Sequence, residues 1–264
     1  MSERGRTISN RGGAGVAIAR IGEIRNDEEE EYGEAGKRSG DIEFKNVGFS
    51  YEDGKPVLHD VSFKVPQGST LGILGSTGSG KSTLMYLLDR LYPVTDGTIT
   101  IGGQDINDIP PATIRSNIGF VLQEGYLYTG TIADNISVAG DDISQEEVEH
   151  AAEAACVDDN IRGFAQGYET VVGERGVTLS GGQKQRVSIA RTLVRKTPIL
   201  VFDDSLSAVD SDTDAAIRAR LAKEFGGATV ILISHRITTV MHADNPIAME
   251  AGTIAEQGTS PALL

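Results

Sequence analysis

The chain has 264 residues, of which 39% are hydrophobic and 5% aromatic, and a formal net charge of −14. This length suffices for one large α/β domain, with or without an inserted subdomain. The acidic charge, without any stripe of Lys and Arg, argues against nucleic-acid binding, because nucleic-acid-binding proteins neutralise phosphates with basic side chains.

A single cysteine, Cys156, excludes an internal disulfide and fits a reducing compartment. The longest apolar runs, such as residues 229–233, are far shorter than the ~20 residues that span a bilayer. No charged-then-apolar signal peptide opens the chain. We therefore expect a soluble cytosolic protein or fragment.

Residues 1 to about 40 differ from the rest. Three arginines precede a short apolar stretch, residues 16–21, and an acidic run follows at residues 27–31 among several glycines. Such charge and glycine content predicts a flexible linker rather than part of a core.

Strand patterns begin after Asp41. Residues 42–47 and 61–65 alternate apolar and polar side chains, with turn residues at 53–56 between them, and residues 98–101 form a further strand closed by two glycines. Residues 71–74 are an apolar strand that leads into a glycine-rich loop.

That loop, Gly75 to Thr83, has the pattern G-x-x-x-x-G-K-[ST] between a strand and a predicted helix over 82–91. Glycines let the backbone wrap a phosphate, and the helix N-terminus adds its positive dipole end. A chance glycine-rich turn is the alternative, and the spacing and both flanks argue against it. Lys81 is expected at the β- and γ-phosphates and Ser82 on Mg²⁺. The nucleotide-binding residues predicted here are Ser76, Thr77, Gly78, Ser79, Gly80, Lys81, Ser82 and Thr83.

Further along the chain, a capping box over 144–147 predicts a helix to about Cys156, and residues 182–194 predict another. The continuous apolar runs 199–202 and 230–233 are typical of parallel strands buried on both faces.

Polar side chains follow both of these strands, Asp203 and Asp204 after the first and His235 after the second. Ligands bind at this edge of open α/β sheets, so Asp203 is a candidate Mg²⁺ ligand and Asp204 is placed to orient the attacking water. The alternatives are an ordinary strand-end Asp pair and a structural histidine.

Residues 179–183, Leu-Ser-Gly-Gly-Gln, followed by Lys-Gln-Arg, resemble the signature motif of ATP-binding cassette (ABC) ATPases. The order and spacing of all the motifs match that family along residues 41–260. The resemblance implies an α/β fold: a phosphate-loop NTPase core with a mixed sheet, an antiparallel β-subdomain and a helical subdomain inserted at about 120–195. It also implies ATP and Mg²⁺ as cofactors.

The resemblance assigns further roles. Tyr51 matches the aromatic that stacks on adenine, with Val57 beside it, although Tyr51 alone could equally cover the edge of the core. Gln123 matches the glutamine that touches Mg²⁺ and hinges the helical insert, but polar residues after strands are common. His235 matches the histidine that contacts the γ-phosphate, and residues 207–210 match the loop that crosses between subunits.

Ser180 and the backbone of Gly181 and Gly182 lie at the start of a predicted helix and form a second anion site, and Gln183 of the same signature is also expected to bind nucleotide. In this family that site closes on the γ-phosphate held by a partner's phosphate loop. The resemblance therefore implies a second cassette as partner, with two ATP molecules held head to tail between them.

Three segments resemble exporters: residues 173–176, residues 127–136 and the stretch 17–21, which is similar to the connection from the last membrane helix. They imply an exporter's cassette, excised or separately encoded, at the cytoplasmic face of a membrane through its membrane domain. The ending at residues 261–264 is short for the family and favours a trimmed chain.

The chain departs from the family at Asp204, where the general base is normally Glu. A carboxylate drawn back by ~1 Å can cost ~10²-fold in rate. We therefore favour the slow-site half of a heterodimeric exporter. The alternatives are a homodimer in which Asp204 suffices as base, and a regulatory ATP-binding module with little hydrolysis of its own. A soluble family member acting on DNA or ribosomes fits neither the exporter segments nor the acidic charge.

Overall fold

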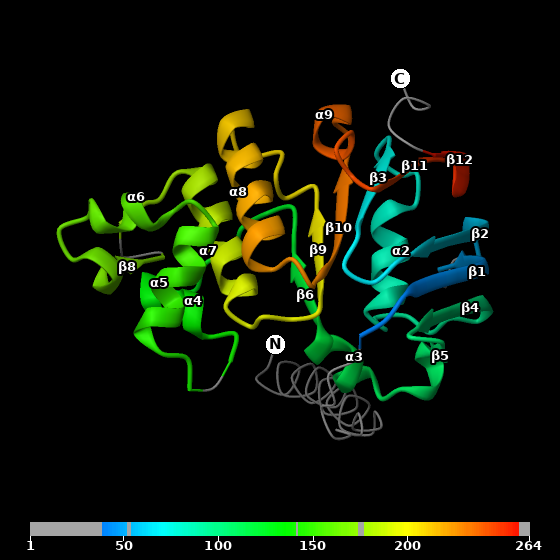
Figure 1. Ribbon diagram of the computed structural model, residues 1–264, viewed down its shortest axis with the longest axis horizontal. Coiled ribbons are helices and arrows are strands. Elements are labelled where there is room, and N and C mark those ends of the chain that lie inside the picture. The colour runs from blue at the N-terminus through cyan, green and yellow to red at the C-terminus, as the bar shows by residue number, and fades with distance from the viewer. Residues whose placement is uncertain (1–38, 52–53, 141, 174–176, 259–264) are drawn as a thin grey trace, which may run out of the picture. The chain divides into compact units, whose positions relative to one another are not determined.

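The computed structural model describes residues 39–51, 54–140, 142–173 and 177–258. They form an α/β fold with a six-stranded mixed sheet, a four-stranded antiparallel sheet and surrounding helices (Figure 1). The fold class predicted from the sequence is therefore confirmed. The exporter-like stretch 17–21, residues 174–176 and the ending 261–264 lie outside the described residues, as does nearly all of the predicted linker over 1–40.

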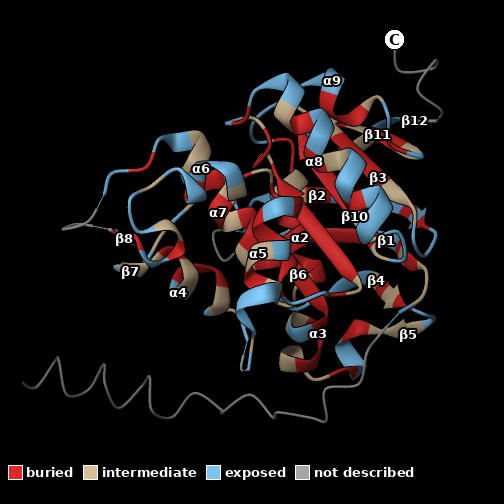
Figure 2. Cartoon of the chain, turned by 60° about the vertical axis from the view of Figure 1, so that its left-hand side comes forward, coloured by how far each residue is buried: buried red, intermediate tan, exposed pale blue. Residues whose placement is uncertain are grey.

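The mixed sheet has the order β12-β11-β3-β10-β9-β6, in which β12 pairs antiparallel with β11 and the other pairings are parallel. Its strands are β3 (Thr70–Gly75), β6 (Ile118–Val121), β9 (Ile199–Asp203), β10 (Thr229–Ser234), β11 (Asn245–Glu250) and β12 (Thr253–Gln257). As their apolar runs predicted, β9 and β10 are buried almost throughout (Figure 2). The carboxyl ends of β3, β9 and β10 share one edge, where the phosphate loop, Asp204 and His235 follow them.

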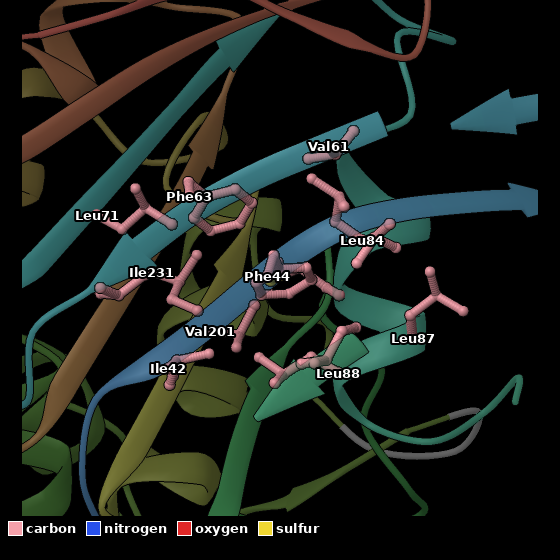
Figure 3. Close-up of a cluster of buried hydrophobic side chains, with 14 of the residues drawn as sticks. Ile42, Phe44, Val61, Phe63, Leu71, Leu84, Leu87, Leu88, Val201 and Ile231 are labelled. Carbon is pink, nitrogen blue, oxygen red and sulfur yellow. The ribbon is translucent and has the colours of Figure 1, made fainter. Parts of the chain in front are cut away.

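The antiparallel sheet has the order β2-β1-β4-β5. Its strands are β1 (Ile42–Ser50), β2 (Pro56–Val65), β4 (Asp96–Ile101) and β5 (Gln104–Asp105). The rings of Phe44 and Phe63 stack with centroids 4.4 Å apart on its inner face. Figure 3 shows these rings in one buried cluster with Leu84 and Leu88 of α2 (Lys81–Leu88) and with residues of the mixed sheet. This packing fixes the helix that carries the phosphate loop.

Helix α2 is shorter than predicted, because it ends at Leu88 rather than at residue 91. Arg90 has a φ of 55°, which takes the chain out of the helical region. The Leu91 N–H then donates to the Tyr86 carbonyl and the Arg90 N–H to the Leu87 carbonyl, as in a Schellman end. The sequence carries no Gly at this point, so the stop could not be foreseen.

The other helices cover the mixed sheet and extend beyond β6. A second buried cluster joins α4, α5 and α7 to β9 and α8, and the predicted boundaries of the helical subdomain remain a prediction. The capping box at Ser144 and Glu147 is present at the start of α5. No described helix is long and apolar enough to cross a bilayer. The helices and short elements are α3 (Pro111–Asn117), α4 (Ile132–Ser137), α5 (Gln145–Ala154), α6 (Asp158–Arg162), α7 (Gly181–Leu193), α8 (Ser211–Glu224), α9 (Ile237–Val240), η1 (Ile106–Asp108), η2 (Gly167–Glu169), β7 (Gly130–Thr131) and β8 (Val171–Val172).

Asp89, just after α2, yields a stability prediction. Burial raises its pKa to about 6, although the positive charges of Arg115 and Arg195 act to lower it. Because the pKa of Asp89 in the folded state lies above the usual 3.8, the folded state binds a proton here more tightly than the unfolded state. This proton binding stabilises the fold fully below pH ~4, and the stabilisation is lost as the pH rises through 6. We expect Asp89→Asn to be more stable than the unsubstituted chain at pH 8 by about 1–2 kcal/mol, with the difference shrinking towards pH 4.5. Thermal unfolding at both pH values measures this, and a difference independent of pH would contradict it.

Candidate functional site

The phosphate loop joins β3 to α2 and is shaped by Gly80. This residue caps α2 with a φ of 97°, and a Cβ atom on it would lie 2.7 Å from Leu58 Cδ2. Glycine alone meets both constraints without strain. The backbone N–H groups of the first turn of α2 have no partner within the helix and can bind an anion, whereas the Ser79 N–H of the loop donates to the Ser76 carbonyl at 3.2 Å.

Lys81 is folded into the loop. Its Nζ donates to the carbonyl oxygens of Gly75 at 2.8 Å and Ser76 at 2.7 Å, and it lies 3.4 Å from Ser79 Oγ. Burial lowers the pKa of Lys81, while the carboxylates of Asp203 and Asp204 act in the opposite direction. The ammonium group is therefore held beside the loop, close to two acidic side chains.

A cavity of about 430 Å³ opens over this loop, and we call it the phosphate-loop cavity. Every residue that lines it was singled out from the sequence. They are Tyr51, Val57, Thr77, Gly78, Gly80, Lys81, Ser82, Thr83, Gln123, Asp203, Asp204 and His235. Ser76 and Ser79 contact Lys81 rather than the cavity. That these residues bind nucleotide stays a prediction.

A larger cavity of about 570 Å³ lies between α6 and α8, and its lining mixes acidic and basic side chains. It has no loop of backbone donors, so it does not compete as an anion site.

The metal-binding residues predicted from the sequence lie together in the phosphate-loop cavity. Ser82 hydrogen-bonds to the Asp203 carboxylate, and Gln123 lines the same space. Burial raises the pKa of Asp203, and the Ser82 hydrogen bond partly offsets this. Hydroxyl, carboxylate and amide oxygens suit Mg²⁺, which takes few protein ligands besides phosphates and water. The residues therefore fit this metal.

Asp204 and His235 form a pair in the lining of the cavity. His235 Nδ1 lies 2.8 Å from Asp204 Oδ2, and Ser234 Oγ lies 3.4 Å from the other carboxylate oxygen. The Asp204 backbone has a φ of 47°, and its N–H donates to the Ile233 carbonyl of β10. Neighbouring parallel strands thus bring the two side chains together, as their positions after β9 and β10 predicted.

The other end of the cavity is aromatic. The Tyr51 hydroxyl lies 3.0 Å from Thr83 Oγ1, and its ring meets those of Phe49 and Tyr92 edge-on, at centroid distances of 4.9 and 5.2 Å. These contacts and the hydrogen bond hold the Tyr51 ring in place at the cavity wall. The sequence reasoning missed Tyr92, since nothing near it forms a motif.

The signature residues lie elsewhere. Ser180 caps α7 through the Gln183 N–H at 3.2 Å, and the Gln183 side chain accepts from the Ser180 N–H. A Cβ atom on Gly181 would meet nothing within 4 Å, so the chain is open to solvent at this residue, whereas one on Gly182 would lie 3.4 Å from the Ala208 carbonyl oxygen. Among the described residues, none of the four signature positions lines the phosphate-loop cavity.

The sequence profile of the family described as ABC transporter matches residues 58–207, more than half of the chain. The chain belongs to the ABC transporter family. As an ABC ATP-binding domain it binds ATP.

Similar proteins extend the comparison. This ABC domain is 47% identical over 86% of its length to 27% of human ATP-binding cassette sub-family B member 6. It is 42% identical over 95% of its length to 36% of the alpha-hemolysin translocation ATP-binding protein HlyB of Escherichia coli. A solved structure of a bacterial Atm1-family ABC exporter with ATP bound superposes with a TM-score of 0.86, covering 96% of this chain and 45% of that chain at 38% identity. The domain thus spans less than half the length of these proteins.

Proposed function

We propose that this domain is the ATPase of an exporter. In this proposal it pairs head to tail with a second cassette around MgATP and powers export through a membrane domain, while hydrolysis at its own site is slow. The observation that carries the proposal is the division of the site. The phosphate-loop cavity gathers the groups predicted to bind ATP and Mg²⁺, whereas none of the described signature residues lines it and Gly181 is open to solvent.

This division favours a dimer. The signature loop offers backbone donors at the start of α7 and a dipole for an anion, but within one chain it meets no phosphate site. A second cassette turned head to tail places each signature loop over the other's phosphate loop. Such an arrangement completes two sites at once, as a closed two-fold assembly does.

The slow site follows from Asp204. This carboxylate is one methylene shorter than Glu and is already engaged by His235 at 2.8 Å. A base held back in this way orients water poorly, because positioning errors near 1 Å cost ~10²-fold in rate. An intact signature loop still allows the domain to complete a faster site on a Glu-bearing partner.

A membrane partner is supported by an exposed apolar surface. Leu122, Tyr126 and Tyr128, which follow β6, are 55%, 68% and 53% exposed. Exposed aromatic groups of this kind mark contact surfaces. Export and translocation are named for the similar proteins, whose additional length leaves room for the membrane domain. In this proposal the domain works at the cytoplasmic face of the membrane.

A regulatory ATP-binding module is the second candidate, and the Asp204–His235 pair favours it. In that case the domain holds ATP and gates a partner that does the chemistry. The two candidates differ in whether a restored base yields turnover, as argued in the Discussion.

ATP binding is tested with Lys81→Ala. Removing the ammonium group beside the phosphates is expected to weaken MgATP binding by about a hundredfold, because charge-assisted contacts to phosphate are worth ~2–3 kcal/mol. Calorimetric titration of the purified chain with MgATP measures the affinity. Lys45→Ala, on β1 and paired with Glu43, is the matched control and should bind as the unsubstituted chain does. Equal affinities for the Lys81 variant and the control would contradict the proposal.

A further inference from the structure

Gln185 is a buried polar side chain to which the sequence analysis gave no role. It lies in the second turn of α7 and is only 1% exposed. Its Nε2 donates to the carbonyl oxygen of Leu122 at 3.0 Å. The hydrogen bond joins the helix that begins with the signature motif to the segment that leaves β6.

The same segment also packs against the backbone of α7 at Lys184 and Gln185. A Cβ atom on Gly125 would lie 2.9 Å from the backbone N and Cα of Gln185. Only glycine lets the chain approach this closely, so residues 122–125 lie directly on the helix. Gln123, between these two contacts, is the residue of the segment that lines the phosphate-loop cavity.

A further anchor holds the next residues of this segment. Arg191 of α7 donates to the Tyr126 carbonyl at 2.9 Å and to the Asn135 carbonyl at 2.7 Å. Asn135 is 1% exposed and exchanges hydrogen bonds with the Tyr128 backbone. Gln123 therefore projects from a segment that is fixed to α7 on both sides.

We propose that Gln185 is a positioning residue, which holds the segment Leu122–Gly125 on α7 so that Gln123 stays directed at the Mg²⁺ of bound MgATP. The inference rests on the proposed function and deepens it. Its consequence is that the Mg²⁺ end of one site and the signature loop of the same chain are carried by one helix. When Gln123 moves towards the metal, the start of α7 therefore moves with it.

The test replaces Gln185 by Met, which keeps the volume of the side chain and its helix propensity but removes the donor. We expect the dissociation constant for MgATP to rise about fivefold, as for the loss of one neutral hydrogen bond. The affinity for ATP in EDTA should stay unchanged, because Gln123 acts through the metal. Amide exchange of residues 122–128 should become faster in the nucleotide-free chain.

A double-mutant cycle with Gln123→Ala distinguishes positioning from general loosening. Once Gln123 is gone, the Gln185 substitution should have no further effect on MgATP affinity. Gly125→Ala displaces the segment without touching the Gln185 side chain and should show the same Mg²⁺-dependent loss. Gln145→Met is the matched control. Gln145 lies on the exposed start of α5, and its side chain hydrogen-bonds to Glu149.

Two results would overturn the inference while leaving the proposed function intact. One is an equal loss of affinity with and without Mg²⁺, and the other is independent effects of the two glutamines in the cycle. If the unsubstituted chain does not bind MgATP at all, the proposed function fails and the inference fails with it.

Discussion

Replacing Asp204 by Glu is expected to raise steady-state MgATP hydrolysis by about a hundredfold. The added methylene carries the carboxylate ~1 Å further towards the attacking water, and misplacement on this scale costs ~10²-fold. The longer side chain is also expected to reach beyond the contact with His235, whose Nδ1 lies 2.8 Å from the Asp204 carboxylate in the present chain. The rate per chain should rise with protein concentration, because each site needs a second signature loop.

The measurement compares the unsubstituted chain, Asp204→Glu and the double variant that adds Lys81→Ala, over a range of protein concentrations. The double variant should return to background. If the unsubstituted chain already turns over as fast as Asp204→Glu, Asp204 is a working base and the slow-site proposal is wrong. If neither chain hydrolyses ATP although both bind it, the regulatory module is the better description.

The site was predictable where chemistry forces both residue type and spacing. The phosphate loop needs glycine at a φ of 97° in Gly80, a lysine next to it and a hydroxyl after that, so its function can be read from consecutive letters. Asp203 and His235 follow buried apolar runs, and parallel strands end at one edge. The closeness of these two residues thus followed from the two strand predictions, over 199–202 and 230–233, and both strands are confirmed.

The contacts that hold these residues in place were not predictable in the same way. Gln185 follows the signature motif and shares a helix face with Ile189 and Leu193, so its spacing does indicate burial. Its partner is a backbone carbonyl 63 positions away, however, and such a pairing has no sequence pattern. The end of α2 was not predicted for a related reason. It is set by the left-handed backbone of Arg90, and no sequence pattern marks an arginine for that conformation. Helix propensity and periodicity report on local structure, whereas these contacts depend on tertiary packing.

Two inactive variants of the Asp204→Glu chain are expected to regain activity when mixed. One carries Gly181→Asp, which places a negative charge where the signature loop meets the γ-phosphate of a partner's ATP. The other carries Lys81→Ala, which disables its own phosphate loop. Head-to-tail pairing gives the mixed dimer one complete site, formed by the phosphate loop of the first chain and the signature loop of the second.

An equal mixture should hydrolyse ATP at about a quarter of the rate of the Asp204→Glu chain, since half of the dimers are mixed and each has one site of two. Gly181 suits this experiment, because a Cβ atom on it meets nothing within 4 Å and the change does not disturb its own chain. Each variant alone should remain at background. A mixture that stays at background would contradict head-to-tail pairing, whereas activity of the Gly181→Asp chain by itself would mean that hydrolysis does not use the signature loop. If activity returns only in the mixture, the phosphate loop of one chain and the signature loop of the other must meet across the interface, because the two loops are separate within one chain.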